Sequence, residues 1–447
     1  MHFVMLIRVY NMWITEWKER SKVDKILFPL LLLTYTAVML YLFAMQCYQV
    51  PHFVSDMPDY VNHVMGIEGN YEFPYPLFFW ASRVLAVFME APAAVAVATA
   101  LFNAAAVVLV KIYMNRRAKE IIWNISATNI LQGRKRLAYD LAITGMIFAL
   151  FLLGNLYSPK NTAFFGFDYA YRCMGIYTPN PIWNATYLAT RPFTVVCFFE
   201  AVRMLGMIER ESKVQNRPGN LSVWKAFPWK ETIPFAVSLF LTTFTKPSFS
   251  MVVLPAIALY MIWQLIWTKG KSFLFAFCLC LTMIPTFADL LYQFGGVFSG
   301  TNVMGEETGI GFEFAKVWSN YSKNIPLSII MGMALPIGVL VLNLKEVVKD
   351  AYYRFAWFNY LVGMGMFLCL YEKGFRMLHA NFSWGYMHGM FFVFLMTLIY
   401  MIKNTIQWRK SWKVVFVLAE WSVLAYHLVC GVYFLIYALQ GNELAGF

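Results

Sequence analysis

The sequence contains few charged residues. Asp, Glu, Lys and Arg make up 13% of its 447 residues, whereas a soluble domain typically carries about 25%. Hydrophobic residues account for 60% and aromatic residues for 18%. Apolar stretches close to ~20 residues long recur along the whole chain, and a helix of that length crosses ~30 Å of hydrocarbon. This composition excludes a soluble globular protein and predicts an all-α polytopic membrane protein.

CxxC pairs and internal repeats are also missing, and a cleavable leader is not expected. The seven cysteines mostly lie inside apolar stretches and none forms a CxxC pair, so neither a disulfide framework nor a zinc site is expected. The lack of a repeat disfavours many transporter folds. About 26 polar-to-mixed residues precede a first apolar stretch of full spanning length, which is not typical of a cleavable signal peptide.

The apolar stretches predict eleven membrane spans. We place them at about 27–48, 91–113, 137–157, 186–207, 231–246, 248–267, 272–294, 326–344, 355–371, 384–402 and 414–438. Residues 76–90 are apolar but contain Arg83 and Glu90. They are predicted to form an interfacial amphipathic helix in the first outer loop.

The distribution of basic residues predicts the orientation of the chain. Alternate segments, beginning with the N-terminus, hold 25 of the 36 Lys and Arg residues, whereas the opposite loops hold six. Basic residues are enriched in cytoplasmic loops, so we expect a cytoplasmic N-terminus. The same bias accounts for most of the net charge of +12 without a nucleic-acid partner.

The first outer loop, residues 49–75, has four carboxylates, two histidines and no Lys or Arg. On a helical turn, Asp56 and Asp59 would point to one side, near His63 on the next turn. Such a cluster could bind a divalent metal such as Mg²⁺ or Mn²⁺ through oxygen ligands, or it could hold a general base. A solvated acidic loop is the alternative interpretation.

The other outer segments supply cations beside aromatic residues. Guanidinium groups bind phosphate bidentately. An unpaired charge within a span is costly, so its presence indicates a function. The alternative interpretation is that these cations are interfacial anchors or belong to solvated loops. Residues 295–325 begin with a Gly-rich stretch that we interpret as a lid. Asp289 lies within a span and is expected to have a partner. The candidate substrate-binding residues in these segments are Lys160, Arg172, Arg191, Lys246, Arg376 and His379.

Two stretches resemble the GT-C glycosyltransferases. In "SDMPDYVNHVMGIEGNYEFPYPLFFW", Asp56 and then Asp59-Tyr60 are similar to the family's acidic motif, and Tyr75-Pro76-Leu77 to its entry into an interfacial helix. "NPIWNATYLATRPFTVV" is similar to the family's segment at the outer start of a later helix. The spacing Asp-x-x-Asp departs from the usual tighter pair, so the resemblance does not identify the base.

The resemblance covers about 150 residues, and the C-terminal half agrees only in topology. It implies a single domain of residues 1–447, with a GT-C-type module at about 27–210 and variable helices at 231–438.

The implied activity is an inverting sugar transfer on the extracytoplasmic face. The donor would be a polyprenyl-phosphate sugar, and the acceptor a lipid-linked molecule or a glycan. Asp56 or Asp59 would be the base, and Tyr60 and His63 would contact substrate. Cations would converge on the departing phosphate. The only cofactor considered is a divalent metal. Membrane lipids are expected to surround the protein, and a bacterial plasma membrane is the favoured location.

Two other functions fit the same sequence features. A Wzy-type polysaccharide polymerase or ligase would use lipid-diphosphate oligosaccharides, and it would usually carry paired arginines in its large outer loops. A transporter or flippase of lipid-linked sugars would need ionisable residues deep in several spans. The in-span or edge candidates for that role are Asp140, Glu200, Arg203, Asp289 and Glu420. A purely structural scaffold is the least favoured interpretation.

The acidic pair gives the first testable prediction. We expect Asp56→Asn or Asp59→Asn to abolish sugar transfer without affecting expression or folding, because one of these carboxylates must accept the acceptor proton. Transfer by each purified variant is compared with that of the wild type. Full activity in both single variants would contradict a base in this loop.

Overall fold

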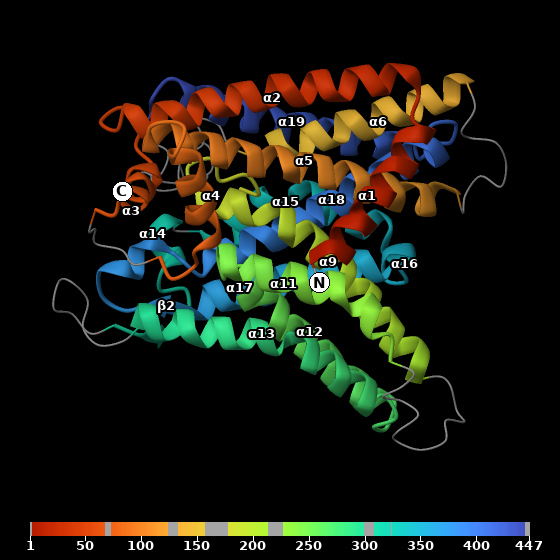
Figure 1. Cartoon of the computed structure of the whole chain (residues 1–447). Coiled ribbons are helices and arrows are strands. Elements are labelled where there is room, and N and C mark those ends of the chain that lie inside the picture. The colour runs from red at the N-terminus through yellow and green to blue at the C-terminus, as the bar shows by residue number, and fades with distance from the viewer. Residues whose placement is uncertain are drawn as a thin grey trace.

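A helix overlaps each of the eleven predicted spans in the computed structural model of the chain (Figure 1). The structure describes residues 2–67, 73–123, 133–156, 178–212, 227–298, 308–322 and 324–442. These helices are α2 (Lys22–Tyr48), α5 (Ala91–Trp123), α6 (Gly133–Leu152), α9 (Ala185–Ser212), α11 (Trp229–Thr245), α12 (Ser250–Trp267), α13 (Phe273–Phe298), α15 (Ile325–Leu342), α17 (Ala351–Cys369), α18 (Ser383–Trp408) and α19 (Val414–Leu439).

Within the described residues, seven helical segments are long and apolar enough to cross a membrane. The chain is therefore an integral membrane protein, as the composition predicts. A full count of eleven spans stays a prediction, because helices such as α9 combine apolar stretches with Arg191, Glu200 and Arg203.

Short elements gather at one end of the bundle, on the left of Figure 1. They include the antiparallel pair β1 and β2, in which Ile310 lies opposite Glu372. The chain beyond α19 reaches the same end, because Gly441 lies against His52 and Phe53. By the predicted orientation this is the extracytoplasmic end. The elements here are α3 (Met57–Met65), α4 (Leu77–Ala86), β1 (Ile310–Phe312), α14 (Trp318–Tyr321), β2 (Leu370–Glu372) and η2 (Gly374–His379).

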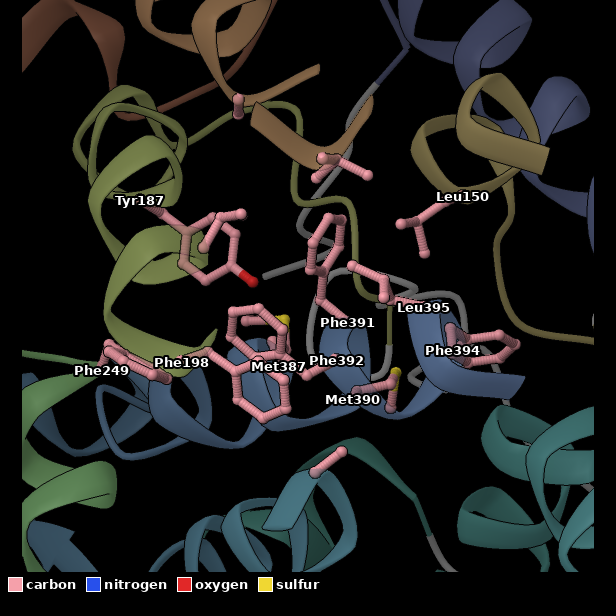
Figure 2. Close-up of a cluster of buried hydrophobic side chains, with 14 of the residues drawn as sticks. Leu150, Tyr187, Phe198, Phe249, Met387, Met390, Phe391, Phe392, Phe394 and Leu395 are labelled. Atoms are coloured by element: carbon pink, nitrogen blue, oxygen red, sulfur yellow. The ribbon is translucent and has the colours of Figure 1, made fainter. Parts of the chain in front are cut away.

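Helix α18 occupies the centre of the bundle. It is apolar on all sides, and its residues 383–404 are buried among α5, α6, α12, α15, α17 and α19. A helix without a polar face is stable only when it is enclosed. Figure 2 shows Phe391, Phe392 and Phe394 of α18 packed with side chains from neighbouring helices, and the Phe392 ring stacks on Phe198 of α9 at 4.2 Å.

Glycines bring α17 and α18 into close contact. A Cβ atom added to Gly389 would lie 2.6 Å from the Cα of Tyr360, and one added to Gly363 would lie 2.8 Å from the Cα of Tyr386. Small residues at such positions let membrane helices approach until their backbones touch. The central helix is therefore held by backbone packing as well as by its large side chains.

Ion pairs hold the opposite end of the bundle together. The carboxylate of Asp24 in α2 accepts hydrogen bonds from Lys111 of α5 at 3.1 Å and from Thr144 of α6 at 2.5 Å. Helix α1 (His2–Glu19) joins this end through Glu16, which pairs with Lys119 at 2.9 Å. Pairing of this kind offsets the cost of burying charge.

The charges that the sequence places within or at the edge of spans also have partners. Asp140 pairs with Arg136 at 2.9 Å, and Glu200 pairs with Arg203 at 2.7 Å. The partner expected for Asp289 is Gln293, which donates a hydrogen bond to it at 2.9 Å. Asn404 donates to Glu420 at 2.7 Å. Each of these groups thus has a local structural role.

The contact between α17 and α18 gives a stability prediction. We expect Gly389→Ala to lower the free energy of unfolding by about 1–3 kcal/mol, because the added methyl group must displace the backbone of α17. Thermal unfolding in detergent measures the change. The matched control is Gly365→Ala on α17, where the added Cβ meets no atom within 4 Å. Equal Tm values for the two variants would contradict the close packing.

Candidate functional site

Asp56 lies at the N-terminal cap position of α3, at the end of the bundle where the short elements gather. Pro58 lies in the first turn of this helix, and Gly66, with a φ of 73°, ends it. The side chain of Asp56 is half-buried, and its Oδ2 accepts a hydrogen bond from Nδ2 of Asn184 at 2.5 Å. A contact with a residue 128 positions away in the chain thus fixes one carboxylate of the predicted acidic pair.

Asn184 is itself fixed by helix α9. It immediately precedes the helix, and its Oδ1 accepts the backbone N–H of Tyr187 at 2.8 Å, as a typical N-cap residue does. The hydroxyl of Thr186 donates to the same oxygen at 3.0 Å. With its oxygen turned toward these donors, the amide must present its NH₂ group to Asp56.

Lys246 meets the same amide from a third segment. It lies in the turn between α11 and α12, outside both helices. Its buried Nζ donates to Oδ1 of Asn184 at 3.0 Å and to Oγ1 of Thr186 at 3.2 Å. It also lies 4.5 Å from the ring centroid of Trp384, which is a cation–π geometry. Asn184 therefore bridges the carboxylate of Asp56 and the ammonium of Lys246.

Aromatic side chains surround this bridge. The hydroxyl of Tyr60 lies 3.3 Å from Oγ1 of Thr186, and its ring makes an edge contact with Phe73 at 5.3 Å. On the other side, Trp384 packs against Trp183 at 6.2 Å and against Tyr187 at 5.7 Å. These tyrosine and tryptophan rings are all buried, so they enclose the bridge.

A chain of hydrogen bonds connects the bridge to η2. Trp384 Nε1 donates to Oδ1 of Asn381 at 3.2 Å, and Asn381 Nδ2 donates to Oε2 of Glu372 at 2.6 Å. Nε of Arg376 donates to the same carboxylate oxygen at 2.9 Å. His379 follows Arg376 by three residues, a spacing that places both side chains on one face of a 3₁₀ helix. Arg376 and His379 therefore lie on one face of η2, with Glu372 as the partner of Arg376.

Burial shifts the pKa values of both bridged charges. Burial raises the pKa of Asp56, while the Lys246 ammonium and the hydrogen bond from Asn184 act in the opposite direction. Burial lowers the pKa of Lys246 to about 7, against the effect of Asp56. Burial also raises the pKa of Asp59. A carboxylate with a raised pKa is a better proton acceptor, and a lysine with a pKa near 7 changes charge at physiological pH.

Two of the predicted substrate-binding residues lie apart from the bridge. The ring of His63 packs against Phe79 at 4.4 Å, and burial lowers its pKa. Arg191 is buried within α9, where its Nη2 donates to the carbonyl of Pro179 at 2.7 Å and its guanidinium lies 4.7 Å from the Phe391 ring. Arg191 is thus enclosed by aromatic rings, including those of Tyr187 and Phe391. Lys160 and Arg172 lie outside the described residues.

The site offers little to a divalent metal. In the described part of the chain, no group of three or more His, Cys, Asp or Glu side chains is placed to hold an ion. Asp56 is already engaged by an amide, and its nearest counter-charge is the Lys246 ammonium. A second cation beside a lysine would be repelled, so these residues do not fit the Mg²⁺ or Mn²⁺ site considered from the sequence.

Sequence reasoning missed several residues of this site. Asn184 carries the one signal that could have identified it, because Asn directly before an apolar helical stretch is a typical N-cap. Thr186, Glu372 and Trp384 have no comparable signal, since only the packing of distant segments brings them to Lys246. No protein-family model, curated protein or solved structure matches this chain.

The buried lysine gives a prediction about pH. Folding favours neutral Lys246 between pH values of about 7 and 10.5, so the unfolded chain binds more protons over that range. Stability should therefore rise with pH there, by at most about 1.4 kcal/mol per unit, and this contribution should be lost as pH falls to 7.

We expect Lys246→Met to remove this slope, measured as Tm in detergent from about pH 6 to 9. The matched control is Lys316→Met, which replaces a more exposed lysine at the same end of the bundle. If Tm changed with pH in the same way in the wild type and in Lys246→Met, the result would contradict the lowered pKa of Lys246.

Proposed function

We propose that this protein is a membrane glycosyltransferase of the GT-C type, acting in the cell-envelope polysaccharide chemistry of a bacterial plasma membrane. It moves a sugar from a polyprenyl-phosphate donor to a lipid-linked or glycan acceptor at the extracytoplasmic end of the bundle. The observation that carries the proposal is the Asn184 amide, which joins the carboxylate of Asp56 to the ammonium of Lys246. An acceptor-activating base and a phosphate-binding cation are the two groups that such a transfer needs.

The proposed step is a single inverting displacement. The acceptor hydroxyl gives its proton to the Asp56 carboxylate while its oxygen forms a bond to C1 of the sugar. The bond between C1 and the phosphate oxygen breaks, and its electron pair leaves with the polyprenyl phosphate. The ammonium of Lys246 and the guanidinium of Arg376 offset the charge that develops on that phosphate.

Asp56 is a better candidate for the base than Asp59. Asp56 is held by Asn184 and lies beside Tyr60 and Lys246. Asp59 has no hydrogen-bond or ion-pair partner within the described ranges. Efficient proton transfer requires a base held within hydrogen-bonding reach of the substrate, and a raised pKa favours the role.

The residues around Asp56 and Lys246 support a sugar substrate with a lipid tail. Trp384 and Tyr60 present aromatic rings beside the bridge, and Arg376 is oriented by Glu372. The isoprenoid chain of the donor would lie between helices in contact with the bilayer. The bias of basic residues supports a cytoplasmic N-terminus and an extracytoplasmic site.

A transfer assay tests the proposal. Purified protein is incubated with radiolabelled polyprenyl-phosphate hexoses and either total membrane lipid or glycan acceptors. We expect Asp56→Asn to reduce the transfer rate by about 10²- to 10⁴-fold, the usual contribution of a general base. The control is Asp59→Asn, which makes the same change one turn away and is expected to retain activity within about tenfold of the wild type.

Three outcomes would contradict the proposal. Full activity of Asp56→Asn would remove Asp56 as the base. Transfer only from lipid-diphosphate oligosaccharides would indicate a polymerase or ligase instead. Movement of lipid-linked sugars across vesicles, without transfer from either donor, would indicate a flippase.

A further inference from the structure

A cavity of about 470 Å³ lies between α9, α12 and α17, at the end of the bundle opposite Asp56. The C-terminal halves of α9 and α12 and the start of α17 form its walls, and α12 diverges from the rest of the bundle in this region (Figure 1). Its lining is mostly apolar. The side chains used below are Leu205, Gly206, Trp263 and Phe355, with Glu209 and Arg354 at its polar end.

The cavity opens toward the side of the bundle. Trp263 is 59% exposed and Leu259 is 49% exposed, although both line the cavity. In an integral membrane protein, apolar side chains at this position face lipid chains and not water. A hydrocarbon chain from the bilayer can therefore enter without crossing a polar barrier.

The polar end of the cavity carries the guanidinium of Arg354. Arg354 lies in the first turn of α17 and is exposed, and its side chain makes no ion pair with another described residue. Glu209 is engaged differently, since its carboxylate hydrogen-bonds the hydroxyl of Tyr260. A ligand that fits this arrangement has an apolar chain and an anionic head at the level of Arg354.

We propose that this cavity binds an anionic phospholipid of the cytoplasmic leaflet, with one acyl chain between α9, α12 and α17 and its phosphate on Arg354. Basic pockets between membrane helices at the cytoplasmic side bind acidic headgroups in this way. Lipid tails are as apolar as the cavity lining. The charge of the headgroup therefore determines which lipids bind more tightly, and the shape of the cavity determines where the acyl chain lies. The site is independent of the proposed sugar transfer.

Gly206 provides a direct test of the cavity. Gly206 lines the cavity, and a Cβ atom added at this position meets no atom within 4 Å, so we expect the side chain of Gly206→Leu to occupy the cavity. The matched control is Gly338→Leu in α15. The surroundings of Gly338 are equally open, but α15 does not line the cavity.

The experiment measures lipid binding to delipidated protein by native mass spectrometry. The probes are dioleoylphosphatidylglycerol, which is anionic, and dioleoylphosphatidylcholine, which is zwitterionic. We expect the wild type to bind phosphatidylglycerol about fivefold more tightly, the usual effect of one basic residue near an anionic headgroup. Arg354→Gln should remove this preference, and Lys349→Gln, an exposed basic residue just before α17, should keep it.

Gly206→Leu should weaken the binding of both lipids, and Gly338→Leu should bind as the wild type does. Unchanged phosphatidylglycerol binding in either Gly206→Leu or Arg354→Gln would overturn the proposal. Competition by inorganic phosphate would also overturn it, because it would assign Arg354 to a soluble anion that has no chain. If Gly206→Leu fails to fold, Arg354→Gln alone still decides, because it changes an exposed side chain.

Discussion

A charge between membrane helices is stable only when another group neutralises or solvates it. This constraint acts at both ends of the bundle. At one end, Asp24 is enclosed by Lys111 and Thr144, and the contact locks α2, α5 and α6 together. At the other end, Asp56 and Lys246 meet through the amide of Asn184. The first arrangement is closed and structural, whereas the second leaves a half-buried carboxylate that a substrate could reach.

The rigidity of the second arrangement comes from the helices that carry it. Asn184 is fixed by capping α9, and Trp384 is fixed in the first turn of α18. Helix α18 is enclosed on all sides and meets α17 through glycine contacts. Site residues on such elements hold their geometry better than residues on free loops. The packed core thereby determines the distance between the carboxylate and the cation.

Helix α9 connects the two regions for which a function is proposed. It begins at Asn184, beside Asp56, and its later turns line the cavity at Gly206. At 1.5 Å per residue, these positions are roughly 33 Å apart along the helix, close to the hydrocarbon thickness of a bilayer. A lipid in the cavity would contact the same helix that Asn184 caps, far from the proposed reaction site.

The sequence by itself determined the helices, because a stretch of about 20 apolar residues has one stable form in lipid. It also placed Asp56 and Asp59 at the start of a helical turn, Lys246 at a helix hairpin and Arg376 beside His379, since each depends on local spacing. Only the tertiary structure decided which of these side chains meet. Asp56 and Asn184 are 128 residues apart, and Lys246 and Asn184 are 62 apart. Helix packing set those contacts and enclosed Arg191 among aromatic rings. No local pattern encodes such contacts, because their geometry depends on how all the helices fit together.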